Sequence, residues 1–182
     1  MTKTAILVGG LPASGKTTVG WTVAHLLDIP CLDKDDFLEE LFEQRGIGDQ
    51  AWRRQLSNES NDLFEAEARR YDFVVLVSHW QSAATPGSGT PTAWVKEAFQ
   101  RIIELNCICP PDIAARRFTG RNRHPGHLDA ERTYDEVAAW MSGMAEGYPL
   151  GVGRLVNVRT DIGIGEAALI TEIRSLLVVG AG

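Results

Sequence analysis

One stretch near the start of the chain, ILVGGLPASGKTTVG at residues 6–20, constrains the fold more than any other feature. It matches G-x-x-x-x-G-K-[ST] at every fixed position, from Gly10 through Gly15 and Lys16 to Thr17. A short apolar run precedes the match, and a segment with apolar residues at helical spacing follows it. Because this motif requires a strand before it and a helix after it, a plain surface turn is the weaker interpretation.

The residue types of this loop suit the binding of phosphate groups. Glycines let backbone N–H groups turn inward without a Cβ in the way, and the following helix adds its N-terminal dipole. The Lys16 ammonium can reach β- and γ-phosphates, and the Thr17 hydroxyl can bind Mg²⁺. The expected nucleotide phosphate site consists of Gly10, Leu11, Pro12, Ala13, Ser14, Gly15, Lys16, Thr17 and Thr18.

Apolar runs and helical repeats alternate along the rest of the chain. Strands are predicted at residues 4–10, 29–33, 72–80, 101–109 and 154–160. Helices are predicted at 16–27, 35–46, 49–71, 93–99, 110–121, 130–148 and 165–177. This alternation is typical of an α/β fold in which helices cover both faces of a parallel sheet. With no internal repeat or linker, the chain is expected to form one domain over residues 1–182.

Composition argues against several classes of protein. The net charge of −6 disfavours a general binder of long nucleic acid or of a membrane surface. No apolar stretch approaches the ~18–20 residues of a membrane span, and the first apolar run is too short for a secretion signal. The cysteines lack a metal-binding spacing, which favours free thiols in a reducing compartment. We therefore expect a cytoplasmic protein that does not bind a membrane.

The second predicted strand ends in CLDKDDF, which places two acids two residues apart. On an extended segment Asp33 and Asp35 both face the phosphate loop, so one can bind Mg²⁺ through water and the other can accept a proton from a substrate hydroxyl. For Asp36 we favour a structural role at the positive end of the following helix. The chain lacks the N-K-x-D of a GTPase, and its third strand ends in SHW rather than in the acid usual for motor ATPases.

Arginines cluster later in the chain, in ARRFTGRNRHPGH. An arginine on a mobile segment can neutralise the charge that develops on a γ-phosphate during transfer. Arg117 and Arg121 are four residues apart, so we expect them to share one helical face, with Arg123 on the loop that follows. The alternative is a solvated basic face, which we favour for Arg116. The segment at about 117–130 is therefore predicted to be a lid.

Three stretches, GGLPASGKTT, LDKDDF and CPPDIAARRFTGRNRHPGH, resemble the P-loop small-molecule kinases in their order and spacing. The chain is similar to shikimate kinase, gluconate kinase and chloramphenicol phosphotransferase, and to proteins grouped as AAA-type ATP-binding proteins. The resemblance implies a P-loop fold with a five-stranded parallel sheet, a closing lid, ATP with Mg²⁺, and phosphorylation of a small hydroxylated compound.

The same resemblance implies a role for single residues. By position, Asp35 corresponds to the acid that holds the substrate, and Asp33 to the acid on the metal side. Arg117 corresponds to the arginine that commonly packs near the adenine, and Arg121 and Arg123 correspond to lid arginines. The glycine-rich acceptor signature of the shikimate kinases is absent after the third strand, so the sequence leaves the acceptor open.

These observations favour an ATP-dependent phosphotransferase that moves the γ-phosphoryl group to a hydroxyl of a metabolite or an antibiotic. Lys16, Asp35, Arg121 and Arg123 are the expected catalytic residues, although Asp33 is an alternative base. Two other functions stay open: a nucleoside or polynucleotide 5′-hydroxyl kinase, and a nucleotide-dependent binding module with weak ATPase activity. The negative charge speaks against long nucleic acid, and a binding module has no need of an acceptor acid. We expect a monomer or a homodimer.

Overall fold

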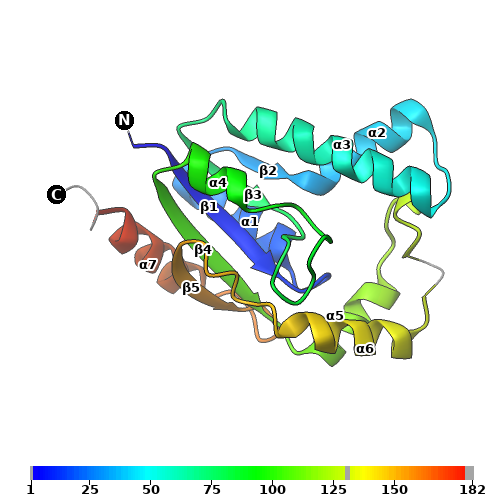
Figure 1. Cartoon of the computed structure of the whole chain (residues 1–182). Helices are drawn as coiled ribbons and strands as arrows, with labels where there is room; N and C mark the ends of the chain where they lie inside the picture. The colour runs from blue at the N-terminus through cyan, green and yellow to red at the C-terminus, as the bar shows by residue number, and fades with distance from the viewer. Residues whose placement is uncertain (1, 130–131, 179–182) are drawn as a thin grey trace.

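Five parallel strands form the sheet at the centre of the molecule, in the order β2-β3-β1-β4-β5 (Figure 1). The computed structural model describes residues 2–129 and 132–178. The strands are β1 (Thr4–Gly10), β2 (Cys31–Asp33), β3 (Phe73–Val77), β4 (Arg101–Ile108) and β5 (Arg154–Arg159). Every residue of β1 is buried, as expected for the middle strand of a sheet covered on both faces. The predicted α/β fold with a five-stranded parallel sheet is confirmed.

Helices connect the strands and cover both faces of the sheet. They are α1 (Lys16–Leu27), α2 (Lys34–Arg45), α3 (Gln50–Ala68), α4 (Ala93–Ala98), α5 (Pro111–Gly120), α6 (Tyr134–Ala145) and α7 (Glu166–Val178), with a short 3₁₀ helix, η1 (Pro125–His127). Helices α1 and α7 pack on the face of β1 that carries Ile6. Helices α3 and α4 pack on the opposite face, which carries Leu7. Side chains alternate across β1 in this way because successive residues of a strand point to opposite faces.

Two helical hairpins extend past the sheet on one side of the molecule (Figure 1). In the hairpin of α2 and α3, a small core consists of Leu38, Leu41, Phe42 and Leu56. In the hairpin of α5 and α6, the packed residues include Ala114, Phe118, Val137 and Met141. The segment that follows α5 crosses from the second hairpin to the first (Figure 1). The predicted lid segment therefore starts on one hairpin and contacts the other.

Several element boundaries differ from the sequence-based prediction. The strand predicted at 72–80 ends at Val77, because the neighbouring β1 turns into the phosphate loop and β2 ends at Asp33. The helix predicted at 110–121 ends at Gly120. Helix α6 begins at Tyr134, after a capping box formed by Thr133 and Glu136. Residues 130 and 131, which include the end of the predicted lid, lie outside the described residues.

Strand register determines which residues meet at the carboxyl edge of the sheet. Val8 of β1 pairs with Val77 of β3, and Val77 also pairs with Asp33 of β2. The phosphate loop, the SHW segment and the paired acids therefore follow three adjacent strands at the same edge, where ligands of parallel sheets bind.

Two other features bear on the sequence-based expectations. No helix within the described ranges is long and apolar enough to span a membrane. Cys31, Cys107 and Cys109 are free thiols, and burial raises the pKa of Cys31 and Cys107 to about 12, so neither is a reactive thiolate at neutral pH.

Candidate functional site

The turn between β1 and α1 needs backbone conformations that few residues adopt. Gly10 and Gly15 have φ angles of 139° and 93°, and a Cβ on Gly10 would lie 2.7 Å from the carbonyl oxygen of Cys107. Gly15 is the N-cap of α1, so the loop ends at the positive end of the helix dipole. These glycines allow the tight curl that presents backbone N–H groups to phosphate oxygens.

Two polar side chains, a partly buried lysine and a buried serine, belong to this loop. The Lys16 ammonium donates to the carbonyl oxygens of Gly10, at 3.1 Å, and Leu11, at 2.8 Å. Burial lowers the pKa of Lys16 to about 8. The Ser14 hydroxyl is buried and has no hydrogen-bond partner among the described residues. Because an unpaired buried hydroxyl is costly, its position fits a ligand such as a phosphate oxygen as the missing partner.

Thr17 and Asp33 join the phosphate loop to the end of β2. The Thr17 hydroxyl donates to one carboxylate oxygen of Asp33 at 2.7 Å, and the other oxygen accepts from the backbone N–H of Asp35 at 3.1 Å. Asp33 therefore also caps α2. Burial, assisted by the charge of Asp35, raises the pKa of Asp33 to about 6. A hydroxyl and a carboxylate side by side are the oxygen ligands that Mg²⁺ prefers, so this pair fits the metal role.

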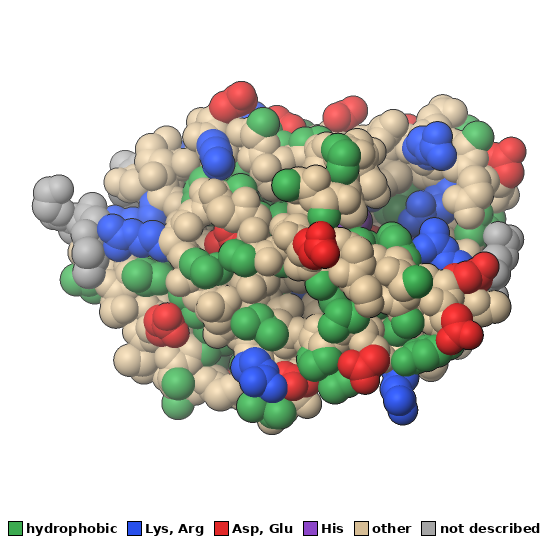
Figure 2. Space-filling view, turned by 60° about the horizontal axis from the view of Figure 1, so that its bottom comes forward, with side chains coloured by type: hydrophobic (Ala, Val, Ile, Leu, Met, Phe, Trp, Pro, Cys, Tyr) green, Lys and Arg blue, Asp and Glu red, His purple; other side chains and the backbone are tan. Residues whose placement is uncertain are grey.

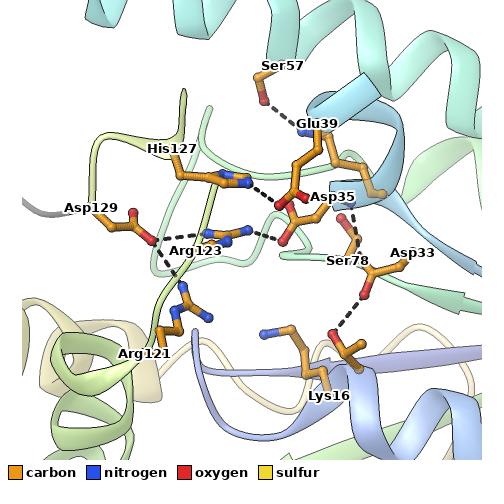
Figure 3. Close-up of polar contacts among 12 residues, drawn as sticks. Lys16, Asp33, Asp35, Glu39, Ser57, Ser78, Arg121, Arg123, His127 and Asp129 are labelled. Atoms are coloured by element: carbon orange, nitrogen blue, oxygen red, sulfur yellow. Dashed lines mark hydrogen bonds and ion pairs between the residues drawn. The ribbon is translucent and has the colours of Figure 1, made fainter. Parts of the chain in front are cut away.

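Asp35 lies in the first turn of α2, where it forms an ion pair with Arg123 (Figure 3). Burial by itself would raise the pKa of Asp35, but the charge of Arg123, followed by those of His127, Lys34 and Lys16, holds the pKa below its ordinary value. The carboxylate is therefore ionised at neutral pH. Arg123 comes from the predicted lid segment, so this ion pair connects that segment to the first turn of α2.

The Asp129 carboxylate contacts both Arg121 and Arg123 of the predicted lid segment (Figure 3). One of its carboxylate oxygens accepts from Arg121 at 3.2 Å and from Arg123 at 3.3 Å. The expectation that Arg117 and Arg121 share one helical face is wrong, because α5 ends at Gly120 and the backbone of Arg121 is extended. The turn away from the helix axis directs Arg121 toward Asp129, with its guanidinium 4.6 Å from the ring centroid of Phe118.

Arg117 lies apart from the other arginines, at the ends of β4 and β5. Its guanidinium donates to the carbonyl oxygen of Thr160 at 3.1 Å and contacts the Cys109 thiol at 3.7 Å. A Cβ on Gly15 would lie 3.6 Å from the Thr160 side chain, so Arg117 approaches the phosphate loop from the side opposite Asp35. This position is compatible with a nucleotide-binding role. Arg116 is exposed, in line with the solvated role that we favour for it.

Residues 124–127 pack against α2. The His124 ring stacks on Phe42 at a centroid distance of 5.3 Å and an angle of 11°, and it hydrogen-bonds to Glu43 at 3.0 Å. The buried His127 ring meets the same phenyl ring at 88° and hydrogen-bonds to Glu39 at 2.8 Å. The two histidines therefore attach the predicted lid segment to the helix that carries Asp35.

Further charged residues of the site are not identified by the sequence motifs. The Lys34 ammonium is buried and donates to the Ser57 hydroxyl at 2.9 Å, and burial lowers its pKa to about 8. The Nε atom of Arg53, on α3, is buried and has no partner among the described residues. On the face shown in Figure 2, Lys and Arg side chains gather in a recess on the side where the two hairpins lie. Lys34 interrupts the paired acids and gives a weak sequence signal, whereas Arg53 and Asp129 give none.

The sheet order, the phosphate loop and the acids at the end of β2 define the class of this protein, the P-loop kinase fold. The chain belongs to the AAA domain family, whose model matches residues 6–146.

Individual kinases and kinase-like proteins are also similar to this chain in sequence or in fold. A shikimate kinase from Corynebacterium jeikeium (strain K411) is 29% identical over 162 residues, which cover 78% of this chain and 79% of that protein. A crystal structure from Chloroflexus aurantiacus, described provisionally as a kinase, matches with a TM-score of 0.79 and 24% identity over 96% of this chain and 98% of that one. A shikimate kinase from Bacteroides thetaiotaomicron matches with a TM-score of 0.61 and 19% identity over 96% and 98% of the two chains.

Proposed function

We propose that this protein is an ATP-dependent kinase that transfers the γ-phosphoryl group to a hydroxyl of a small molecule. The observation that carries the proposal is the arrangement around Lys16. Thr17 and Asp33, a pair suited to Mg²⁺, lie on one side, and Asp35 with Arg123 lies on the other. All five side chains belong to one polar cluster at the carboxyl edge of the sheet (Figure 3). The similarity to shikimate kinases supports the same reaction class.

On the nucleotide side, the loop from Gly10 to Thr18 binds the phosphate groups, and Arg117 lies toward the base. Lys16 contacts the β- and γ-phosphates after leaving the carbonyl oxygens that it now contacts. Thr17 and Asp33 hold Mg²⁺, which when bound neutralises charge on the phosphates. Arg121 and Arg123 stabilise the charge that spreads over the γ-phosphate oxygens during transfer.

On the acceptor side, Asp35 accepts a hydrogen bond from the substrate hydroxyl and so orients it toward the γ-phosphorus. We prefer Asp35 to Asp33 for this role because the contacts with Thr17 and with the cap of α2 keep Asp33 beside the phosphate loop, on the side assigned to Mg²⁺. The nearby cations Lys34 and Arg53 have no carboxylate within ion-pair distance among the described residues. This excess of positive charge favours an acceptor that carries an anionic group as well as the hydroxyl.

A screen for ADP formation tests the proposal. Purified protein is incubated with ATP, Mg²⁺ and single compounds drawn from sugar acids, hydroxylated carboxylic acids, amino alcohols and antibiotics, and separately with nucleosides and 5′-hydroxyl oligonucleotides as the competing class. We expect at least one small acceptor to raise ADP formation far above the rate with water alone. Lys16→Ala is the control, because it removes the cation of the loop and should reduce turnover by orders of magnitude while the protein stays folded.

Three results would contradict the proposal. If Lys16→Ala forms ADP as fast as the wild type, the phosphate loop is not the site of reaction. If only 5′-hydroxyl oligonucleotides or nucleosides stimulate turnover, the nucleic-acid alternative is correct. If ATP binds and no compound stimulates turnover, the chain is a nucleotide-dependent binding module.

A further inference from the structure

His79 follows β3 at the centre of the carboxyl edge. The last residue of that strand, Val77, pairs with Val8 on one side and with Asp33 on the other. His79 is two residues past Val77, just as Asp35 is two residues past Asp33. It therefore lies between the strand that leads to the phosphate loop and the strand that leads to the acceptor acid.

The alternation of side chains along β3 indicates where His79 points. Val75 and Val77 pack in the core under α1 and α7, whereas Val74, Leu76 and Trp80 pack in the core under α3 and α4. An odd-numbered residue that continues this pattern lies on the face of α1, the helix that begins with Lys16. His79 is thus directed toward the end of α1 that carries the phosphate loop.

The backbone around His79 is held in place. Its carbonyl oxygen accepts from the backbone N–H of Thr90 at 2.8 Å, and the indole of the next residue, Trp80, donates to the carbonyl oxygen of Val8 at 3.0 Å. Gly89 has a φ of 94°, and a Cβ there would lie 2.6 Å from the His79 carbonyl oxygen. Hydrogen bonds therefore fix the backbone that carries the imidazole, which is not part of a free loop.

The imidazole itself has an unused polar atom. The Nδ1 atom of His79 is buried and has no hydrogen-bond partner among the described residues. The charged groups that face the ring come from three helices: Lys16 from α1, Lys34 and Asp35 from α2, and Arg53 from α3. Burial, assisted by the three cations, lowers the pKa of His79 to about 4, so the ring is neutral at pH 7 and has a free lone pair.

We propose that His79 is the base that takes the proton of the acceptor hydroxyl. This inference rests on the proposed kinase function. The acceptor O–H, which Asp35 orients on binding, turns to an imidazole nitrogen of His79. As the acceptor oxygen forms its bond to the γ-phosphorus, the O–H bond breaks and the proton moves to that nitrogen. The bond between the γ-phosphorus and the bridging oxygen breaks, and its electron pair leaves with ADP. The imidazolium that results faces the carboxylate of Asp35, which stabilises it.

The surroundings of Asp35 suit a hydrogen-bond acceptor, and those of His79 suit a base. Asp35 is ion-paired with Arg123, which makes its carboxylate a weak base but a good fixed hydrogen-bond acceptor. His79 faces Lys16, so the negative charge of a nucleotide bound at Lys16 opposes the cations that depress its pKa. Nucleotide binding should therefore raise the basicity of His79 at the stage when a base is needed.

The first experiment needs no acceptor. The pKa of each histidine is followed by NMR of the imidazole Cε1–H group, with and without the non-hydrolysable ATP analogue AMPPNP and Mg²⁺, and His79→Gln assigns the signal. We expect His79 to stay neutral above pH 5 in the free protein and its pKa to rise by at least one unit with AMPPNP. His25, exposed on the last turn of α1, gives the control signal for effects of the nucleotide that do not depend on the site. If the pKa of His79 is the same with and without AMPPNP, the proposal is wrong.

The second experiment measures turnover with the acceptor that gives most ADP in the screen. His79→Ala and His79→Gln should lose about 10²-fold or more in kcat while ATP affinity is unchanged, and added imidazole should partly restore His79→Ala only. His25→Ala is the matched control. If the wild type is active and His79→Gln is equally fast, the base assignment is wrong. If the wild type forms no more ADP than Lys16→Ala, the kinase function itself has failed.

Discussion

Replacing Asp33 by Asn should make the folded protein more stable while it removes the carboxylate that we propose as a Mg²⁺ ligand. The carboxylate is 5% exposed, and its pKa is about 6 in the folded protein against 3.8 for an unperturbed aspartate. The folded state therefore binds this proton more tightly than the unfolded state. Below about pH 4 Asp33 is protonated in the folded protein and this cost is absent. As the pH rises to 6 and beyond, the carboxyl must ionise in its buried position, and the folded state is increasingly destabilised.

The magnitude follows from the two pKa values. Each unit of pKa difference corresponds to about 1.4 kcal/mol, so the ionised carboxylate lowers the free energy of unfolding by about 3 kcal/mol at pH 8 and by about 1 kcal/mol at pH 4.5. Asn is nearly isosteric and an equally good helix cap: its Oδ1 can accept from the backbone N–H of Asp35 while its side-chain N–H donates to the Thr17 hydroxyl. For a chain of this length, Asp33→Asn should raise Tm by about 6–12 °C at pH 8 and by about 2–4 °C at pH 4.5.

Thermal unfolding followed by circular dichroism between pH 4.5 and pH 8 measures this difference, and calorimetry measures the affinity for ATP with Mg²⁺. Asp36→Asn is the matched control, since Asp36 is less buried than Asp33 and should give a smaller gain. We expect Asp33→Asn to lose the enhancement of ATP affinity by Mg²⁺. A gain in Tm that is the same at every pH, or a lower Tm at pH 8, would refute the reasoning.

Three other substitutions test the site. Asp35→Asn should bind ATP with Mg²⁺ about as well as the wild type by calorimetry but lose turnover; a large loss of affinity would make Asp35 a metal-side residue. Arg121→Ala should slow ADP formation by about 10²–10³-fold with only about 1 kcal/mol lost in urea unfolding, and an unchanged rate would return Arg121 to a surface role. Gly126→Ala places a Cβ 2.5 Å from the Phe42 ring and should cost about 1–3 kcal/mol and expose the lid segment to proteolysis; undiminished protease resistance would contradict its docking on α2.

Much of the fold and half of the site can be predicted from the sequence because the signals are local. The phosphate loop needs glycines at φ values that other residues avoid, a lysine and a hydroxyl within eight consecutive positions, so Gly10–Thr17 is recognisable by itself. The parallel direction of the strands follows from the alternation of strands and helices, whereas their order in the sheet does not.

The other half depends on contacts between distant positions. Arg123 and Asp35 are 88 residues apart, and nothing in either segment specifies that they meet. In the sequence, Asp129 looks like an ordinary loop residue. Its contact with Arg121 depends on the end of α5 at Gly120, after which the chain turns away from the helix axis. His79 looks like the end of a strand, and only the register of β3 between β1 and β2 places it beside Lys16 and Asp35.

The attachment of residues 124–127 to Phe42 joins the two hairpins beside Asp35. Arg123 reaches Asp35 from this crossing, although the Asp35 side chain is still 46% exposed. The contacts of two imidazole rings with one phenyl ring therefore also fix the position of an ion pair. Any movement that separates His124 and His127 from Phe42 would carry Arg123 away from Asp35, so the two contacts should form and break together.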